Sequence, residues 1–240
     1  MAVNLDQHFM IDKDLLKEVA SYADEFDVIL EIGPGKGALT EELAKRAQMV
    51  FAIEKDNDFM EELEEKFTGS KKVVFMFDDV MKAEFPRFTK CISNLPYSIC
   101  EPLLWSLFSL EFESSVLVVP EGFADILIGK SWSKLNYILP IFYSIKKVKT
   151  IPRDAFFPEP RVKSALVVLT PRKSDNPLRE IYLQYDKKLR NALREMVMKK
   201  DDLTKRKASL QVSTMFPKKM LDKKVLNLSA VEIKQLMEKV

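Results

Sequence analysis

Glu31-Ile-Gly-Pro-Gly-Lys-Gly37 contains three of the chain's six glycines, and this concentration indicates a local geometric need. It follows a short apolar run, Val28-Ile-Leu-Glu-Ile32, and precedes a helical pattern that begins at Ala38. Glycines at a strand-to-helix turn permit positive φ angles and let a ligand approach the backbone closely. A tight turn that binds nothing needs the same residues, so this stretch alone leaves a nucleotide-like ligand and an empty turn both open.

Outward from this turn, residues 12–120 alternate between helical and strand patterns. Apolar runs that are buried on both faces and separated by helices predict a mainly parallel sheet in an α/β, Rossmann-like domain. Two later β-type runs, 137–145 and 162–169, are expected to add antiparallel edge strands. Strands are expected at 28–32, 49–53, 73–76, 90–93 and 115–119, and helices at 12–23 (with Asp12 as N-cap), 38–47, 56–67 and 101–110.

The pattern changes after Pro171, where a polar linker leads into three helical stretches near 178–199, 203–215 and 229–239. We therefore predict two domains, 1–172 and a small helical domain at 173–240. Between Asp186 and Lys224 there are 13 Lys and Arg against 5 Asp and Glu, although the whole chain carries only +2. A basic appendage is typical of proteins that bind polyanions such as RNA, and a solvated helical face has the same composition.

The bulk composition excludes several classes of protein. With 47% hydrophobic and 31% charged residues, the 240-residue chain has the balance of a soluble globular protein. No apolar run approaches the roughly 20 residues that span a bilayer, and the N-terminus lacks the regions of a signal peptide, so we expect a cytoplasmic protein without a membrane partner. Two cysteines and one histidine are too few for a disulfide framework or a His- and Cys-based metal site. No metal is expected, and a monomer is the default expectation.

Two acidic residues follow the next strands and sharpen the ligand prediction. Glu54 ends the second strand, where a carboxylate can accept hydrogen bonds from both ribose hydroxyls of an adenosine. Asp79 follows the third strand, where a carboxylate could accept a hydrogen bond from the adenine amine. Together with Gly33 and Gly35 in the glycine turn, these residues predict a site for an adenosine-containing cofactor.

The motif Ser93-Asn-Leu-Pro-Tyr97 follows the fourth strand and carries the predicted chemistry. The exocyclic amine of adenine is a poor nucleophile, because its lone pair is delocalised into the ring. The side-chain oxygen of Asn94 and the backbone carbonyl of Leu95 can accept its hydrogens, and Pro96 fixes the turn that presents this carbonyl. The Tyr97 ring can stack on the base, so that the amine attacks a sulfonium methyl in line. An Asn-x-Pro turn with a buried tyrosine is the alternative.

A second aromatic residue could complete the base site. The segment Ala155-Phe-Phe-Pro-Glu-Pro160 contains Phe156, which could close on the other face of a base that stacks on Tyr97. A base held in this way must be unstacked, or must come from a loop or a single strand. A core phenylalanine beside a rigid loop is the alternative for Phe156.

Taken in order, these motifs resemble those of the KsgA family of rRNA adenine dimethyltransferases, which includes the archaeal and eukaryotic Dim-type enzymes. The chain is also similar to the erythromycin-resistance rRNA methyltransferases. The resemblance covers roughly residues 6–170. It rests on Gln7-His-Phe-Met10, Ile29-Leu-Glu-Ile-Gly-Pro-Gly-Lys-Gly-Ala-Leu-Thr-Glu41, Ile53-Glu54, Asp79, Asn94-Leu-Pro-Tyr97 and Phe156-Phe-Pro-Glu-Pro-Arg-Val-Lys-Ser164.

The resemblance implies a class I methyltransferase fold that uses S-adenosylmethionine. It further implies dimethylation of two adjacent adenines near the 3′ end of small-subunit rRNA during ribosome assembly. It also implies cofactor contacts from His8, Met10, Gly33, Glu54 and Asp79, with Asn94 between the cofactor and the target.

The chain departs from the family pattern in three places. Asp6 replaces a glycine, the segment 119–127 lacks the usual Gln, Glu and Arg, and Trp132-Ser-Lys-Leu-Asn136 replaces a Tyr-Gly-x-Leu-Ser pattern. An assembly factor that binds pre-rRNA with little or no methyl transfer is therefore one alternative. A DNA adenine methyltransferase is another, although about 70 residues after position 170 leave little room for a large target-recognition domain.

Overall fold

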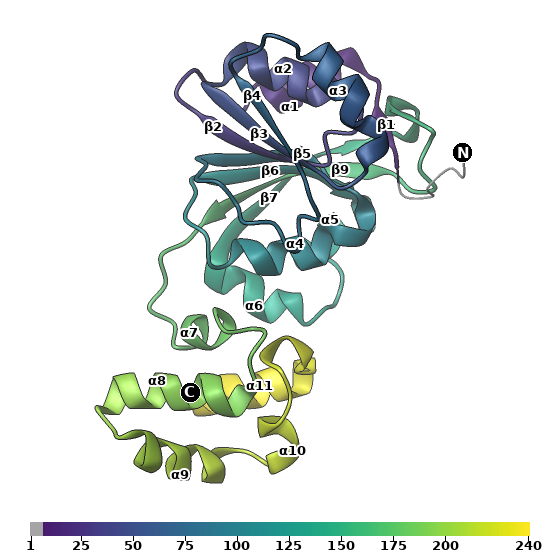
Figure 1. Ribbon diagram of the computed structural model, residues 1–240. Coiled ribbons are helices and arrows are strands. Elements are labelled where there is room, and N and C mark those ends of the chain that lie inside the picture. The colour runs from purple at the N-terminus through teal and green to yellow at the C-terminus, as the bar shows by residue number, and fades with distance from the viewer. Residues whose placement is uncertain (1–6) are drawn as a thin grey trace. The chain divides into compact units, whose positions relative to one another are not determined.

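The computed structural model describes residues 7–240 (Figure 1). Met1 to Asp6 lie outside the described residues, so the family departure at Asp6 and the expectation for the N-terminus also lie outside them. The chain divides into two compact units. The first contains the residues up to Ile128 together with 145–171, and the second contains 129–144 together with 172–240. Among the described residues, no helix is both long and apolar enough to cross a membrane.

One sheet forms the centre of the first unit, and within residues 7–240 its strand order is β4-β3-β2-β5-β6-β9-β7. The first five of these strands pair in parallel, and β9 pairs antiparallel with β6. This topology confirms the predicted α/β fold with a mainly parallel sheet. The bounds are β2 (Val28–Ile32), β3 (Met49–Glu54), β4 (Val73–Phe77), β5 (Lys90–Asn94), β6 (Ser114–Pro120), β7 (Tyr143–Ile151) and β9 (Ser164–Pro171).

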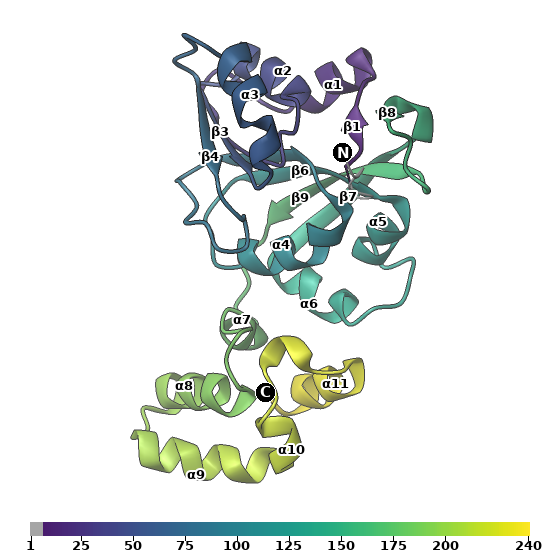
Figure 2. The same ribbon diagram turned by 45° about the vertical axis from the view of Figure 1, so that its right-hand side comes forward.

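Helices cover both faces of this sheet. Figures 1 and 2 show α1 (Lys13–Ala20), α2 (Ala38–Arg46) and α3 (Met60–Lys66) on one face, and α4 (Cys100–Leu107) and α5 (Glu121–Leu127) on the other. The predicted cap of α1 is confirmed, because Oδ1 of Asp12 accepts hydrogen bonds from the backbone N–H groups of Asp14 and Leu15 at 2.9 and 3.0 Å.

The strand order reverses between β2 and β5, and this reversal positions the site. From β2 the chain continues through β3 to β4 on one side, and then crosses to β5 and β6 on the other. Ligands of open α/β sheets bind outside the carboxyl ends of the strands at such a point. The glycine turn, Glu54, Asp79 and Asn94 all lie at these carboxyl ends.

A short two-stranded ribbon lies apart from the main sheet, and it was not predicted from the sequence. It pairs β1 (Phe9–Met10) antiparallel with β8 (Phe156–Phe157), in the register Phe9 with Phe157 and Met10 with Phe156. Two-residue strands are too short for an alternating pattern to be recognised. The ribbon brings two segments that are about 150 positions apart in the chain into direct contact.

The second unit is helical, and it corrects one strand prediction. Residues 137–142, expected to be extended, lie in α6 (Leu135–Phe142), since a short apolar run does not distinguish a buried helix from a buried strand. Within this unit, Arg179 donates from Nη1 to the Ile141 carbonyl at 3.4 Å and lies over the Phe142 ring. The remaining helices are α7 (Leu178–Tyr182), α8 (Leu189–Asp201), α9 (Lys205–Met215), α10 (Lys218–Leu221) and α11 (Ala230–Lys239).

The division into units also differs from the predicted domains in one segment. The first unit ends at Pro171, and residues 129–144, assigned from sequence to the first domain, fall in the second unit. The two domains, 1–172 and 173–240, stay a prediction. The side-chain ammonium of Lys134 donates to the Leu226 carbonyl at 2.8 Å, which ties the start of α6 to the C-terminal helices.

Candidate cofactor and base-binding site

Two adjoining cavities lie at the carboxyl ends of the central strands, and four residues line both: Gln7, Gly33, Glu54 and Pro96. The smaller cavity has a volume of about 100 Å³ and lies beside the β1 segment, the glycine turn and the Asn94–Tyr97 motif. The larger has a volume of about 500 Å³ and is lined by residues that follow β3 and β4. Small-molecule sites typically measure about 300–1,000 Å³, so the larger cavity is within this range.

The glycine turn is shaped by its neighbours as well as by its backbone. Gly33 and Gly35 have φ angles of 67° and 53°, in the left-handed region that favours glycine. A Cβ atom on Gly35 would lie 2.7 Å from the Phe9 ring, and one on Gly33 would lie 3.2 Å from Pro96. Both glycines therefore serve the close approach of two protein segments, the β1 strand and the Asn94–Tyr97 motif, to the turn.

Glu54 is buried at the end of β3 and belongs to the lining of both cavities. One carboxylate oxygen accepts a hydrogen bond from the Gly35 N–H at 3.0 Å, and the other accepts from the Asp56 N–H at 2.9 Å. Each carboxylate oxygen has two lone pairs, so both can accept a further hydrogen bond. The side-chain amide of Gln7 donates to Asp56 at 2.8 Å and connects the N-terminal segment to the same place.

Asp79, predicted to contact the adenine of a cofactor, lines the larger cavity. Its carboxylate pairs with Lys55 at 3.1 Å and accepts a hydrogen bond from the Met81 N–H at 3.0 Å. The Met81 hydrogen bond and the Lys55 ammonium lower the pKa of Asp79, so the group is an anionic acceptor at neutral pH.

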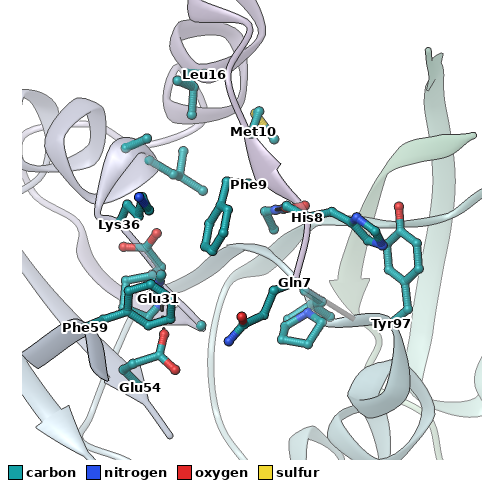
Figure 3. A pocket seen from close by; sticks show the side chains of 18 residues that line it. Gln7, His8, Phe9, Met10, Leu16, Glu31, Lys36, Glu54, Phe59 and Tyr97 are labelled. Atoms are coloured by element: carbon teal, nitrogen blue, oxygen red, sulfur yellow. Dashed lines mark hydrogen bonds between the residues drawn. The ribbon is translucent and has the colours of Figure 1, made fainter. Parts of the chain in front are cut away.

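Glu31 is a buried acid on β2 that faces the smaller cavity. Figure 3 shows it beside Phe9 and Phe59, on the same side of the site as Glu54. Among the described residues its Oε2 atom has no hydrogen-bond partner. Burial, together with the nearby Glu54 charge, raises its pKa to about 8. A proton or a bound cation is needed to satisfy this carboxyl group at neutral pH.

The orientation of the Asn94 amide is fixed by His8. Nδ2 of Asn94 donates to the His8 backbone carbonyl at 3.0 Å, and a carbonyl oxygen can only accept, so the amide nitrogen must face it. Asn94 lines the smaller cavity, and no donor among residues 7–240 bonds to its Oδ1 atom. The His8 ring is held in turn, because its Nδ1 lies 2.8 Å from the Pro158 carbonyl and must carry the proton.

Tyr97 lies at the same cavity, with its ring beside that of His8 (Figure 3) and ring centroids 5.5 Å apart. Its hydroxyl forms a 2.6 Å hydrogen bond with the hydroxyl of Ser164 on β9. Leu95 is buried, and its N–H donates to the Val118 carbonyl at 3.1 Å. The motif that follows β5 is thus held in place by contacts with β6 and β9.

One expected residue, Phe156, lies elsewhere than predicted. Phe156 does not line either cavity: its side chain is 1% exposed and belongs to the core that also contains Ala155. Stacking on a base is therefore contradicted for this conformation, because the register of β8 with β1 turns Phe156 inward. Phe157 points the other way and is 69% exposed. Met10, by contrast, is buried and lines the smaller cavity.

Comparison with known proteins identifies the family of this chain. The model of the family described as "Ribosomal RNA adenine dimethylase" matches residues 2–238. The chain belongs to the ribosomal RNA adenine dimethylase family. This assignment confirms the resemblance predicted from the motifs.

Relatives of this dimethylase family are similar along most of the chain. A protein of Thermococcus sibiricus named "Probable ribosomal RNA small subunit methyltransferase A" is 39% identical over 181 residues, which cover 73% of this chain and 66% of the relative. A protein of the same name from Methanococcoides burtonii is 34% identical over 247 residues, covering 96% of this chain and 90% of the relative.

Two solved structures are similar to this chain along almost its whole length. A dimethyladenosine transferase of Plasmodium falciparum has a TM-score of 0.67 at 27% identity, covering 96% of this chain and 97% of that one. The 23S rRNA methyltransferase ErmE has a TM-score of 0.64 at 21% identity, covering 96% of this chain and 98% of that one, and so shows the shared fold.

Some residues around the two cavities were not assigned from sequence. Gln7, Phe9 and Lys36 line the smaller cavity, and the Lys36 ammonium lies 5.9 Å from the centre of the Phe9 ring. Glu31 could have been found, because it is a lone acid within a strand that is otherwise apolar. Within residues 7–240, no group of three or more His, Cys, Asp or Glu is placed to hold a metal ion.

Proposed function

We propose that the chain transfers methyl groups from S-adenosylmethionine to N6 of adenines in small-subunit rRNA. The proposed targets are two adjacent adenines near the 3′ end, each dimethylated during ribosome assembly in the cytoplasm. The observation that carries this proposal is the Asn94 amide: its nitrogen donates to the His8 carbonyl, which leaves its oxygen as an available acceptor on a residue that lines the smaller cavity.

The residues around the two cavities fit the cofactor. Glu54 and Asp79 are acceptors suited to ribose hydroxyls and to an adenine amine, and both line the larger cavity. Oε2 of Glu31 has no hydrogen-bond partner among the described residues, and Glu31 lines the smaller cavity, where a cationic group would satisfy this oxygen. We therefore assign the adenosine half of the cofactor to the larger cavity and its charged half to the smaller one. When bound, the cofactor supplies an electrophilic sulfonium methyl group.

The chain's own residues would position and activate the amine. Oδ1 of Asn94 accepts one amine hydrogen, the backbone carbonyl of Leu95 accepts the other, and both interactions favour a pyramidal nitrogen with an available lone pair. The Tyr97 ring, held by Ser164, stacks on the adenine and aligns the amine with the methyl group. Positioning and electrostatics are sufficient for this reaction, which requires no strong general base.

An adenine can enter this cavity only after it leaves its helical stack, which suits a loop or an unpaired segment of rRNA. Phe157 replaces Phe156 in our proposal as the second aromatic contact, since it is exposed and follows directly from the buried position. We further propose that residues 173–240, with their surplus of basic side chains, bind the RNA backbone. The chain is proposed to act as a monomer.

The test measures incorporation of tritium from labelled cofactor into small subunits purified from cells that lack this methylation. Incorporation into rRNA that is lost in Asn94→Ala is the expected result. Tight binding of the subunits without incorporation by the wild-type chain would instead support the assembly-factor alternative. Incorporation into duplex DNA and not into RNA would support the DNA methyltransferase alternative.

A further inference from the structure

The second unit contains a cavity that no part of the proposed methyl transfer uses. It has a volume of about 440 Å³ and lies among α8, α9 and α10. Its polar lining consists of two guanidinium groups, an ammonium and two hydroxyls, from Arg190, Arg194, Lys218, Ser209 and Ser213. Every charged side chain in this lining is a cation, and every other polar side chain can donate a hydrogen bond.

The two arginines are already oriented by neighbours outside the lining. Arg190 forms an ion pair with Asp222, and Nη1 of Arg194 donates to Oδ1 of Asn191 at 3.2 Å. A guanidinium group held in this way loses less rotational freedom when it binds an anion. Each arginine keeps further N–H donors beyond the one used in this contact, because a guanidinium carries five.

The remaining cation is unpaired. Within residues 7–240, the ammonium of Lys218 forms no ion pair or side-chain hydrogen bond, although α10 is fixed by the buried side chains of Met220 and Leu221. The floor of the cavity is apolar, since Val212 and Leu221 are both buried. The cavity therefore combines a fixed backbone with cationic side chains that have no anion among the lining residues.

We propose that this cavity binds a phosphate group of the RNA backbone through Arg190, Arg194 and Lys218, with the two serine hydroxyls as additional donors. Guanidinium groups match the paired oxygens of a phosphodiester, and lysine adds a point charge. The contact is independent of base sequence, so it would anchor the helical unit on rRNA without selecting a nucleotide. This inference rests on the proposed function only in taking RNA as the ligand.

The test measures binding of small ribosomal subunits to the full chain over a series of salt concentrations, without cofactor. Arg194→Gln and Lys218→Gln should each weaken binding about 3- to 10-fold and reduce the slope of log affinity against log salt by roughly 0.7–0.9, as expected for one lost phosphate contact. The matched controls are Lys219→Gln and Arg206→Gln, which remove the same charge from exposed positions outside the lining. Equal losses in all four variants would overturn the proposal, because they would show a general effect of charge.

A second pair of variants does not touch the arginines. Ser209→Asp places a carboxylate in the cavity, whereas Thr214→Asp places one on the same helix outside it. We expect the first to weaken binding at least as much as Lys218→Gln and the second to have a clearly smaller effect, with both variants melting near the wild-type temperature. Ser209→Asp binding as tightly as Thr214→Asp would contradict the assignment.

Two further outcomes distinguish this inference from binding of free phosphate and from the proposed function. Titration with inorganic phosphate, followed by chemical shifts, reports whether phosphate binds in the cavity. If it does, but the variants bind subunits normally, the site is one for free phosphate and the proposal fails. If the wild-type chain binds subunits through this cavity and transfers no methyl group, the inference stands while the proposed function fails.

Discussion

The side-chain nitrogen of Asn94 donates a 3.0 Å hydrogen bond to the backbone carbonyl of His8, 86 positions earlier in the chain. His8 is itself held by the Pro158 carbonyl through Nδ1. These two contacts join the β1 segment, the Asn94–Tyr97 motif and the loop after β8 into one wall of the smaller cavity. The orientation of the amide that is proposed to bind the target therefore depends on an N-terminal segment.

Asn94→Ala should lower the rate of methyl transfer by about 100-fold or more, the scale seen when one positioned polar group is removed from a reaction site. Asn94→Asp should be at least as slow, because a carboxylate cannot donate to the His8 carbonyl and is repelled by it. Single-turnover methylation of small subunits measures both rates. Asn227→Ala, at an exposed position of the second unit, is the control and should be unaffected. Normal turnover by Asn94→Ala would refute the proposed role.

Glu54→Gln should weaken cofactor binding by roughly 10- to 100-fold, since hydrogen bonds to a charged group contribute about 1.5–3 kcal/mol. The substitution also removes one acceptor from the Gly35 and Asp56 N–H groups, which loosens the glycine turn. Calorimetry with S-adenosylmethionine gives the affinity. Glu61→Gln on the exposed side of α3 is the matched control. An affinity equal to that of the control would exclude Glu54 from the cofactor site.

Glu31 should make stability depend on pH in an unusual direction. Burial raises its pKa from 4.5 to about 8, so between these values the folded state keeps a proton that the unfolded state has lost. The free energy of unfolding therefore falls as pH rises from about 4.5 to 8, and this contribution is fully present only below that window. Thermal melting of Glu31→Gln against the wild type measures it: the difference in Tm should shift in favour of the variant with increasing pH. Parallel curves would contradict the shift.

Binding of the cofactor should release the proton of Glu31 near neutral pH. A cation placed at the smaller cavity favours the carboxylate, and the charge of Lys66 acts in the same direction, while Glu54 opposes it. Calorimetric enthalpies in buffers with different heats of ionisation report the number of protons released. The wild type should release a substantial fraction of a proton at neutral pH, and Glu31→Gln should release less. Buffer-independent enthalpies for the wild type would rule out this linkage.

Phe156 and Phe157 should behave in opposite ways when changed to alanine. Phe156→Ala removes a buried ring from the core and should cost about 3–5 kcal/mol of unfolding free energy. Phe157→Ala should change stability by no more than about 0.5 kcal/mol, because the ring is exposed, but should raise KM for small subunits. Denaturant unfolding and steady-state methylation separate the two effects. If Phe157→Ala methylates normally, no base contact can be assigned to it.

Tyr97 offers a test that separates its ring from its hydroxyl. Tyr97→Phe and Ser164→Ala remove the same 2.6 Å hydrogen bond from its two ends, so both should reduce turnover by a similar and small factor. Tyr97→Ala removes the stacking surface as well and should reduce turnover by a further factor of about 10 or more, since base–aromatic stacking contributes about 1–3 kcal/mol. Cofactor affinity should change little in all three. Equal turnover of Tyr97→Ala and Tyr97→Phe would argue against stacking.

Much of the fold could be predicted because its signals are local. The five parallel strands were located within one or two residues, since each is an apolar run bounded by a turn. The glycine turn, Glu54, Asp79 and Asn94 each follow a strand, and parallel strands present their carboxyl ends at one edge of the sheet. The position of each residue directly after a predicted strand was therefore enough to predict that these residues lie close together. The apolar run at 137–142 was mistaken for a strand because its pattern suits a buried helix equally well.

The sequence by itself thus determined which elements form and which motifs share an edge of the sheet. The tertiary structure alone decided which way individual side chains face. Phe156 and Phe157 are neighbours of the same kind, and only the pairing of β8 with β1 turns one into the core and the other to solvent. The same ribbon brings the His8 carbonyl to Asn94. Successive residues of a strand point to opposite faces, so such choices depend on the register between distant segments, which no local pattern encodes.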